Sequence, residues 1–271
     1  MLILLPPSEG KTAPRSGRTL DLDSLALAED GAITAARRDL IDRLAALSAG
    51  PDALDLLGVG PSLAGEVTAN TALTTAPTAP GHRVFTGVLF EALDHASLSA
   101  AAKRRARSHA LVFSALFGVT TLADRIPAHR LSVGATVPGL PGLAAHWRPL
   151  LGPGLDALAE DCAGPVVDCR SGGYAALWKA PAERTLTVDV VQLRAGRRTV
   201  VSHFAKHTRG LVARVLLEAG SRATNTLERT AQTVAQAGDG SDDGGPRWEV
   251  ELIPPAGRQP GSLQIILPEK G

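Results

Sequence analysis

Aromatic residues are scarce in this sequence: they make up 3% of its 271 residues, with one tyrosine. The hydrophobic core must therefore be built largely from leucine, valine, alanine and isoleucine. Trp147 and Trp178 lie in apolar helical patterns, so we expect them to pack in that core. No row of aromatic side chains indicates a stacking platform for single-stranded nucleic acid.

Cysteine and unbalanced charge are also nearly absent. Cys162 and Cys169 are the only cysteines in the sequence and form no Cys-x-x-Cys pair, so we expect two ordinary thiols and no dedicated metal site. The formal net charge is +1, which excludes a global field that would draw the protein to nucleic acid. Any such affinity must come from a local basic patch.

Long hydrophobic runs are missing as well. No apolar stretch approaches the roughly 20 residues that cross a bilayer. The first five residues are apolar without a basic leader and stop at Pro6, so we expect no signal peptide. These features predict a cytoplasmic protein without a membrane partner.

Strand-like and helix-like patterns alternate along most of the chain, and strands cluster near its end. Apolar runs predict strands over 2–5, 110–114, 165–169, 185–193, 199–204, 248–253 and 262–267. Helical spacing predicts helices over 35–48, 88–93, 99–107, 143–161, 172–178, 205–219 and 224–235. We therefore expect an α/β or α+β fold in which helices flank a mixed β-sheet.

We expect residues 1–271 to form a single, monomeric domain. Residues 194–198 separate two predicted strands and read as a hairpin turn. A helical insertion is expected at about 33–74. The glycine-rich, polar stretch at about 237–246 is expected to be a flexible loop.

Polar residues follow the first predicted strand directly. The run Leu2–Leu5 stops at a Pro-Pro pair, after which come Ser8, Glu9 and Lys11. Open sheets hold their ligands at the carboxyl ends of strands, so these three residues are candidates for a ligand site.

A second cluster of this kind follows the strand expected over 199–204. There His203 is expected at the strand end, and Lys206 and Arg209 lie three residues apart on the polar face of the next helix. His203 and His207 are four apart, which on one continuous helix would suit zinc. A structural role is favoured, because we expect the pair to straddle the strand–helix junction and no third ligand is evident nearby.

Three further segments have the same character. They are Val84–Val88 with Thr86 and Gly87, Ser114–Val119 followed by Ile126–Leu131 with Arg130, and Asp168–Tyr174 with Ser171. Together with the two strand-end segments, and in this order along the chain, they resemble the YaaA family of peroxide stress proteins. The chain departs from that pattern in its longer Pro-Ser-Glu-Gly-Lys stretch and in Gly173, where the family has a glutamate, so it resembles a divergent subfamily.

The resemblance implies a cytosolic protein that binds double-stranded DNA without sequence preference and limits iron-dependent damage by peroxide. It also implies a helix-hairpin-helix motif, which the stretch Leu57–Ala64 resembles. Gly58 and Gly60 would let the backbone approach a phosphate there. The alternative is a purely structural turn between two helices, because the usual basic residue at the tip is replaced by Ser62 and Leu63.

Other candidate residues also allow two readings. The basic run 103–107 is either a solvated helix face or a phosphate-binding patch. Arg130 carries a fixed charge that suits phosphate or carboxylate. Asp168, Ser171 and Tyr174 either line a polar ligand site or, for the first two, cap the helix that follows.

The strand-end residues are expected to converge on one cleft of mixed charge, and two functions fit such a cleft. The first is binding of double-stranded DNA by a peroxide stress protein that has no cofactor. The second is an enzyme acting on a nucleotide, nucleobase or similar phosphorylated substrate, with Glu9, Asp168, Tyr174 and His203 as acid and base groups. In both cases we expect contacts from the set Ser8, Lys11, Gly58, Gly60, Thr86, Gly87, Arg130, Ser171, Lys206 and Arg209.

Overall fold

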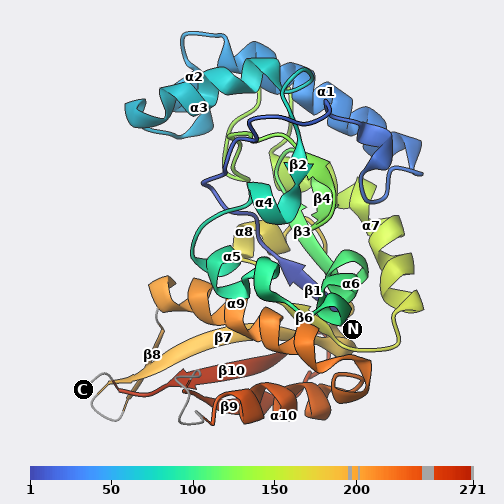
Figure 1. The fold of residues 1–271 in the computed structure, drawn as a ribbon, viewed down its shortest axis with the longest axis vertical. Helices are drawn as coiled ribbons and strands as arrows, with labels where there is room; N and C mark the ends of the chain where they lie inside the picture. The colour runs from blue at the N-terminus through green and yellow to red at the C-terminus, as the bar shows by residue number, and fades with distance from the viewer. Residues whose placement is uncertain (195–196, 201, 240–246, 270–271) are drawn as a thin grey trace.

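The computed structural model describes residues 1–194, 197–200, 202–239 and 247–269 (Figure 1). Its main sheet contains β1 (Leu2–Leu5), β3 (Ala110–Ser114), β4 (Gly118–Thr121), β6 (Val166–Asp168), β7 (Thr185–Arg194), β8 (Arg197–Val200), β9 (Glu249–Ile253) and β10 (Gly261–Leu267). A separate two-stranded sheet pairs β2 (Ala79–Pro80) with β5 (Arg125–Ile126). The fold class expected from the sequence is confirmed.

The main sheet is mixed, with the strand order β4-β3-β1-β6-β7-β10-β9, and β8 pairs with β7 outside this path. The five strands from β3 to β10 are parallel to their neighbours, whereas β4, β8 and β9 are antiparallel additions. All four residues of β1 are buried, as expected of a parallel strand that is covered on both faces. Since β1, β3 and β6 run in one direction, their carboxyl ends meet at one edge of the sheet.

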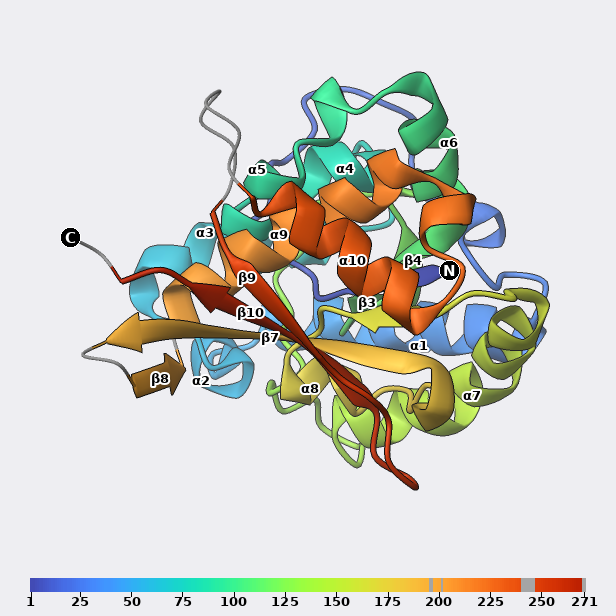
Figure 2. The same cartoon turned by 90° about the horizontal axis from the view of Figure 1, so that it is seen from below.

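Helices cover both faces of the sheet. The helices of the described chain are α1 (Gly31–Ser48), α2 (Ala53–Leu57), α3 (Ala64–Ala69), α4 (Gly81–Val84), α5 (Val88–Leu93), α6 (Ala100–His109), α7 (Leu143–Asp161), α8 (Gly172–Ala175), α9 (Ser202–Ala219) and α10 (Leu227–Ala237). The short 3-10 turns are η1 (Leu22–Ser24), η2 (Pro61–Leu63), η3 (Asn70–Ala72), η4 (His95–Ser97), η5 (Ala182–Arg184) and η6 (Ser221–Ala223). Figure 2 shows α9 and α10 on one side of the sheet and α7 and α8 on the other.

Helices α1, α2 and α3 lie at the end of the molecule opposite β9 and α10 (Figure 1). Helix α1 begins where the Asp30 carboxylate accepts a hydrogen bond from the Ala32 amide, a common N-terminal cap. The fully buried Arg37 ties α1 to the sheet, because it donates to the carbonyl oxygens of Phe117 and Val119 at 3.0 and 2.9 Å. Helices α1, α2 and α3 and the turns η2 and η3 make up most of residues 31–72, and a helix-hairpin-helix motif among them is not confirmed.

The prediction of a strand over 199–204 is wrong for the residues after Val200. Strand β8 ends at Val200 and α9 already begins at Ser202, so His203 and His207 belong to the same helix. Ala205, Thr208 and Val212 form one buried stripe at helical spacing. Burial of this stripe favours a helix that begins within the segment where the β-branched residues predicted a strand. The hairpin expected at 194–198 is confirmed by the pairing of Arg194 with Arg197.

Residues 240–246 of the expected loop lie outside the described residues. In the part of the chain that is described, no helix combines the length and the apolarity needed to traverse a bilayer. The buried apolar side chains join in one cluster that includes β1, both tryptophans of the expected core and residues of the helical insertion.

Candidate functional site

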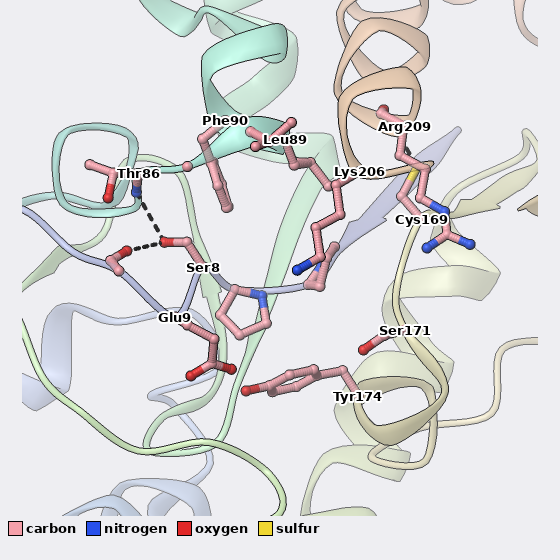
Figure 3. A pocket seen from close by; sticks show the side chains of 15 residues that line it. Ser8, Glu9, Thr86, Leu89, Phe90, Cys169, Ser171, Tyr174, Lys206 and Arg209 are labelled. Carbon is pink, nitrogen blue, oxygen red and sulfur yellow. Dashed lines mark hydrogen bonds between the residues drawn. The ribbon is translucent and has the colours of Figure 1, made fainter. Parts of the chain in front are cut away.

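A cavity of about 310 Å³ opens at the carboxyl ends of β1 and β6 (Figure 3). Its lining comes from the turn after β1, the start of α5, the segment after β6 and the first turns of α9. The lining residues are Pro6, Pro7, Ser8, Glu9, Gly10, Thr86, Gly87, Val88, Leu89, Phe90, Cys169, Ser171, Tyr174, Lys206 and Arg209. The fold thus gathers eight of the candidate residues, Ser8, Glu9, Thr86, Gly87, Ser171, Tyr174, Lys206 and Arg209, around one space.

The turn at residues 6–11 forms one wall of the cavity. The Ser8 hydroxyl donates to the Gly10 carbonyl oxygen at 2.6 Å and accepts from the Thr86 amide at 3.0 Å, which joins this turn to the start of α5 (Figure 3). Gly87 begins α5 with φ at +95°, a conformation that glycine adopts without strain. The turn at residues 6–11 and the candidate segment Val84–Val88 therefore stabilise each other by direct hydrogen bonding.

Glu9 and Tyr174 form the polar side of the cavity. The Glu9 carboxylate and the Tyr174 hydroxyl point toward one another in Figure 3. Tyr174 is 5% exposed, and burial is the main reason why the pKa of its phenol lies above the ordinary value. The nearby Glu9 charge raises this pKa further, whereas Arg130 and the Val133 backbone oppose it. The phenol therefore stays protonated at neutral pH and can donate a hydrogen bond to a ligand.

Lys206 and Arg209 form the positive side. They lie one helical turn apart on α9, and the Lys206 ammonium reaches into the cavity in Figure 3. Within the described ranges, no carboxylate forms an ion pair with either residue. The Arg209 Nε donates to the Val188 carbonyl oxygen at 2.9 Å, which holds the guanidinium against the sheet. Glu9 is the acidic residue in the cavity lining, and its carboxylate lies 3.9 Å from the Arg130 guanidinium, so it does not pair with either of these two cations.

The remaining wall is apolar. Pro6, Pro7, Leu89 and Phe90 cover it, and Cys169 also lines the cavity, close to Arg209 (Figure 3). The pKa of the Cys169 thiol is raised to about 12, mainly by burial, so the sulfur stays protonated and is a poor nucleophile. A ligand here meets an apolar surface between a carboxylate–phenol pair and two cations.

The side chains of Lys11, the last residue of the 6–11 turn, and of Arg130 bind the backbone of this turn. The Lys11 ammonium donates to the Ser8 carbonyl oxygen at 2.8 Å, and Arg130 donates to the Glu9 carbonyl oxygen at 3.0 Å. The pKa of Lys11 is lowered to about 8, chiefly because its burial disfavours the charged form. These two candidate residues thus reach the site through the backbone of the turn and do not line the cavity.

Asp168 does not line the cavity either. Its carboxylate is bound by the Arg170 side chain at 2.7 and 2.9 Å, and both side chains are largely buried. Arg170 in turn donates to the Trp178 carbonyl oxygen at 3.1 Å, so the pair holds the segment that carries Tyr174. Ser171 stands at the start of α8 but makes no capping hydrogen bond, which leaves its hydroxyl free to face the cavity.

Arg170 and Asn70 are supporting residues that sequence reasoning missed. Asn70 is fully buried, accepts from the Arg130 amide at 2.8 Å and donates to the Arg130 carbonyl oxygen at 2.9 Å. Glu66 of α3 lies 3.5 Å from the Arg130 guanidinium. Neither Arg170 nor Asn70 has a spacing from other polar residues that would mark it as functional. The helical insertion therefore reaches the site through these contacts with Arg130.

Gly58 and Gly60 do not line the cavity. Gly58 ends α2 with φ at +65°, and Gly60 precedes the 3-10 turn η2. Between residues 51 and 81 the sequence contains Asp52, Asp55 and Glu66 but no lysine or arginine. The segment of the turn therefore supplies acidic side chains and no basic ones, although Glu66 pairs with Arg130 and Arg43 of α1 lines a hollow together with Asp52.

The basic run on α6 borders the site from outside. Lys103 and Arg107 line a surface hollow of about 560 Å³, and Phe90 lines both this hollow and the cavity. Arg105 is already held, because its Nε donates to the Leu217 carbonyl oxygen at 2.6 Å. The hollow, which Glu91 and Asp94 also line, thus adjoins the cavity at Phe90.

The histidines do not join the cavity in the described part of the chain. His129 is buried, its Nδ1 lies 3.1 Å from the Pro127 carbonyl oxygen, and burial holds its pKa well below the ordinary value. His207 is exposed on α9, and the side chain of His203 lies outside the described residues. Among the residues described, no group of three or more histidine, cysteine, aspartate or glutamate side chains is arranged to hold a metal ion.

The fold and the site together define an α/β protein with a mixed-charge cavity at the carboxyl ends of its central parallel strands. The sequence model of the family described as peroxide stress protein YaaA matches residues 1–234, and the chain belongs to this family. It is 45% identical to a UPF0246 protein of Streptomyces coelicolor, over 99% of both chains. It is also 42% identical to a UPF0246 protein of Corynebacterium efficiens, over 84% of this chain and 89% of the relative.

Proposed function

We propose that this member of the peroxide stress family acts through a small-molecule site, which binds an anionic ligand of the nucleotide or nucleobase class. The observation that carries the proposal is the pair Lys206 and Arg209, which faces the cavity without an acidic partner in the described part of the chain. Charge-assisted hydrogen bonds from such cations are strong where water is partly excluded. They would hold a phosphate or carboxylate group.

The other walls suit the rest of such a ligand. Phe90 and the two prolines offer an apolar surface for a planar ring, and Glu9 and Tyr174 offer an acceptor and a donor for its polar edge. A volume of about 310 Å³ is in the range of small-molecule sites. A duplex, whose major groove alone is about 12 Å wide, could only lie across the mouth.

Catalysis is part of this proposal. Glu9 can accept a proton, the role of a general base, whereas Tyr174, which holds its own proton, can donate a hydrogen bond to negative charge that develops on the ligand. Asp168 is left out, because its carboxylate is already bound by Arg170. The reaction class we infer is proton transfer on a bound nucleotide or nucleobase, in a cytoplasmic protein that lowers damage by peroxide.

Thermal unfolding with adenosine 5′-monophosphate (AMP), adenine and inorganic phosphate tests the ligand site. A specific ligand raises the melting temperature by mass action, and AMP should raise it most, because it contacts both the apolar wall and the cations. Lys206→Met should weaken AMP binding by about ten- to a hundredfold, the loss expected for one charged hydrogen bond. Lys179→Met removes an exposed lysine outside the cavity and should change nothing. Equal shifts for the two variants would contradict the proposal.

Duplex DNA is a second candidate ligand, favoured by the basic residues Lys103 and Arg107 of α6, which line a hollow that adjoins the cavity at Phe90. Binding should be indifferent to sequence, and each phosphate contact should contribute about −0.9 to the slope of log affinity against log salt. Arg104→Ala and Arg107→Ala should each reduce that slope by about this amount. No binding at low salt, or a slope near zero, would remove this candidate.

A cellular test addresses the peroxide-stress role and the limitation of iron-dependent damage. A strain that lacks the protein should lose viability in hydrogen peroxide and recover when the wild-type chain is supplied or when iron is chelated. Rescue by Lys206→Met equal to rescue by the wild type would separate the stress role from the cavity.

A further inference from the structure

Two cations hold the backbone of the turn that presents Ser8 and Glu9 to the cavity. The Lys11 ammonium lies 2.8 Å from the Ser8 carbonyl oxygen and 3.5 Å from that of Glu9. Arg130 donates to the same Glu9 oxygen at 3.0 Å. Carbonyl groups in a turn need partners that regular structure does not supply, and these two side chains supply them.

The orientation of the Ser8 and Glu9 side chains depends on this backbone. The Ser8 hydroxyl can accept from the Thr86 amide only while the turn keeps its shape. The Glu9 carboxylate lies 3.9 Å from the Arg130 guanidinium, which gives its side chain a second constraint. A turn released from its cations would therefore change both cavity-facing groups together.

Lys11 and Arg130 differ in one property. Arginine keeps its charge at every pH that the protein tolerates, whereas a buried lysine can lose a proton. Glu9 on the same turn and Glu66 on α3 stabilise the charged form of Lys11, and Arg130 opposes it. The neighbouring His129 is neutral, and the Phe85 ring centroid lies 5.9 Å from the Lys11 nitrogen. Burial outweighs the two carboxylates, so the Lys11 pKa falls to about 8.

We propose that Lys11 and Arg130 are positioning residues for the cavity, and that the protonation state of Lys11 switches its affinity for an anionic ligand. Protonated Lys11 holds the turn by a charge-assisted hydrogen bond and adds positive charge beside the cavity. Neutral Lys11 loses both effects. The switch rests on the ligand site proposed above, whereas the positioning role concerns the turn itself.

Binding of AMP at pH 7, 8 and 9 tests the switch. The second phosphate proton has a pKa of about 6, so the charge of AMP does not change over this range. Wild-type affinity should fall about tenfold from pH 7 to pH 9. Lys11→Arg keeps a fixed charge and should bind equally at all three pH values, whereas Lys11→Met should bind weakly and equally at all three. A wild-type affinity that stays constant, or falls equally in the arginine variant, would overturn the switch.

Exchange of the Thr86 amide hydrogen tests the positioning role without any ligand. This amide donates to Ser8 only when the turn is held, so the Lys11→Met variant should protect it less than the wild type at pH 7. Lys11→Arg should restore the protection. Equal protection in all three proteins would refute the positioning role.

A direct titration links the two measurements. The sequence contains five lysines, so the nuclear magnetic resonance signal of the Lys11 Cε can be assigned by its loss in Lys11→Met. Its titration midpoint should match the midpoint of the affinity change. A normal lysine titration would overturn the switch. Failure of AMP and phosphate to bind at any pH would instead overturn the ligand site and leave the Thr86 result as the test of the turn.

Discussion

Two glycine-containing turns of this protein, at residues 6–11 and 57–64, are both predicted ligand contacts and have opposite surroundings. Lys11 and Arg130 bind the backbone of the first turn, and Lys206 and Arg209 face it across the cavity. The second turn has three acidic residues and no basic ones in its own segment of the sequence. Glycine spacing therefore reports the path of a backbone, whereas affinity for an anion also requires donors and positive charge around that path.

The acids near the two turns should differ most in their effect on stability. Asp168→Ala leaves the buried Arg170 without its partner, and loss of one member of a buried ion pair costs about 3–5 kcal/mol. Asp55→Ala, which removes an exposed side chain from α2, should change the free energy of unfolding by less than about 0.5 kcal/mol. Urea denaturation of both variants measures the difference. Similar costs would show that the site is no more firmly built than the 57–64 turn.

Substitution of a glycine near each turn by alanine should change stability by almost as different an amount. A Cβ atom at Gly210 would overlap the Leu89 carbonyl oxygen where α9 meets α5, so Gly210→Ala should destabilise the protein by about 3 kcal/mol. Gly60 has φ at −77° and open space around it, so Gly60→Ala should stabilise by about 0.5 kcal/mol. Thermal unfolding of the pair checks the contrast. A destabilised Gly60→Ala variant would place an unseen contact at the 57–64 turn.

Lys11 should make stability depend on pH in a way that nothing in the 57–64 turn can. Its pKa is lowered from 10.5 to about 8, so between these values the unfolded chain binds more protons than the folded one, and stability rises with pH. From pH 8 to pH 10 the wild type should gain roughly 2 kcal/mol relative to Lys11→Met, since one pKa unit corresponds to about 1.4 kcal/mol. Below about pH 7 the two curves should run parallel. Parallel curves up to pH 10 would show that burial of Lys11 has little effect on its titration.

The smallest effect is expected from adding charge to the 57–64 turn. Ser62→Lys restores a basic residue at its exposed tip, yet Asp52, Asp55 and Glu66 still oppose an approaching phosphate. We expect the salt slope of duplex binding to stay unchanged. A slope steeper by about 0.9 would mean that this turn lies on the nucleic acid after all, and that only its charge was missing.

The sequence alone was sufficient for most of the fold. The strand Ala110–Ser114 and the helices Val88–Leu93 and Leu143–Asp161 have the bounds expected from periodicity, because apolar spacing is a local property that burial then satisfies. It also indicated which polar residues would gather. Ser8, Ser171 and their neighbours follow parallel strands, and the ends of parallel strands share one edge of a sheet.

Tertiary structure decided what each gathered residue does. Asp168 and Glu9 are both acids that follow strands, yet Arg170 binds the first and the second faces a cavity. Strand β8 ends at Val200 and α9 begins at Ser202, because the buried face of the helix, with Ala205, Thr208 and Val212, outweighs the β-branched residues that suggested a longer strand. Partners, burial and the resulting charge states arise from contacts between distant segments. Local patterns do not encode such contacts, whereas they do encode the periodicity of single strands and helices.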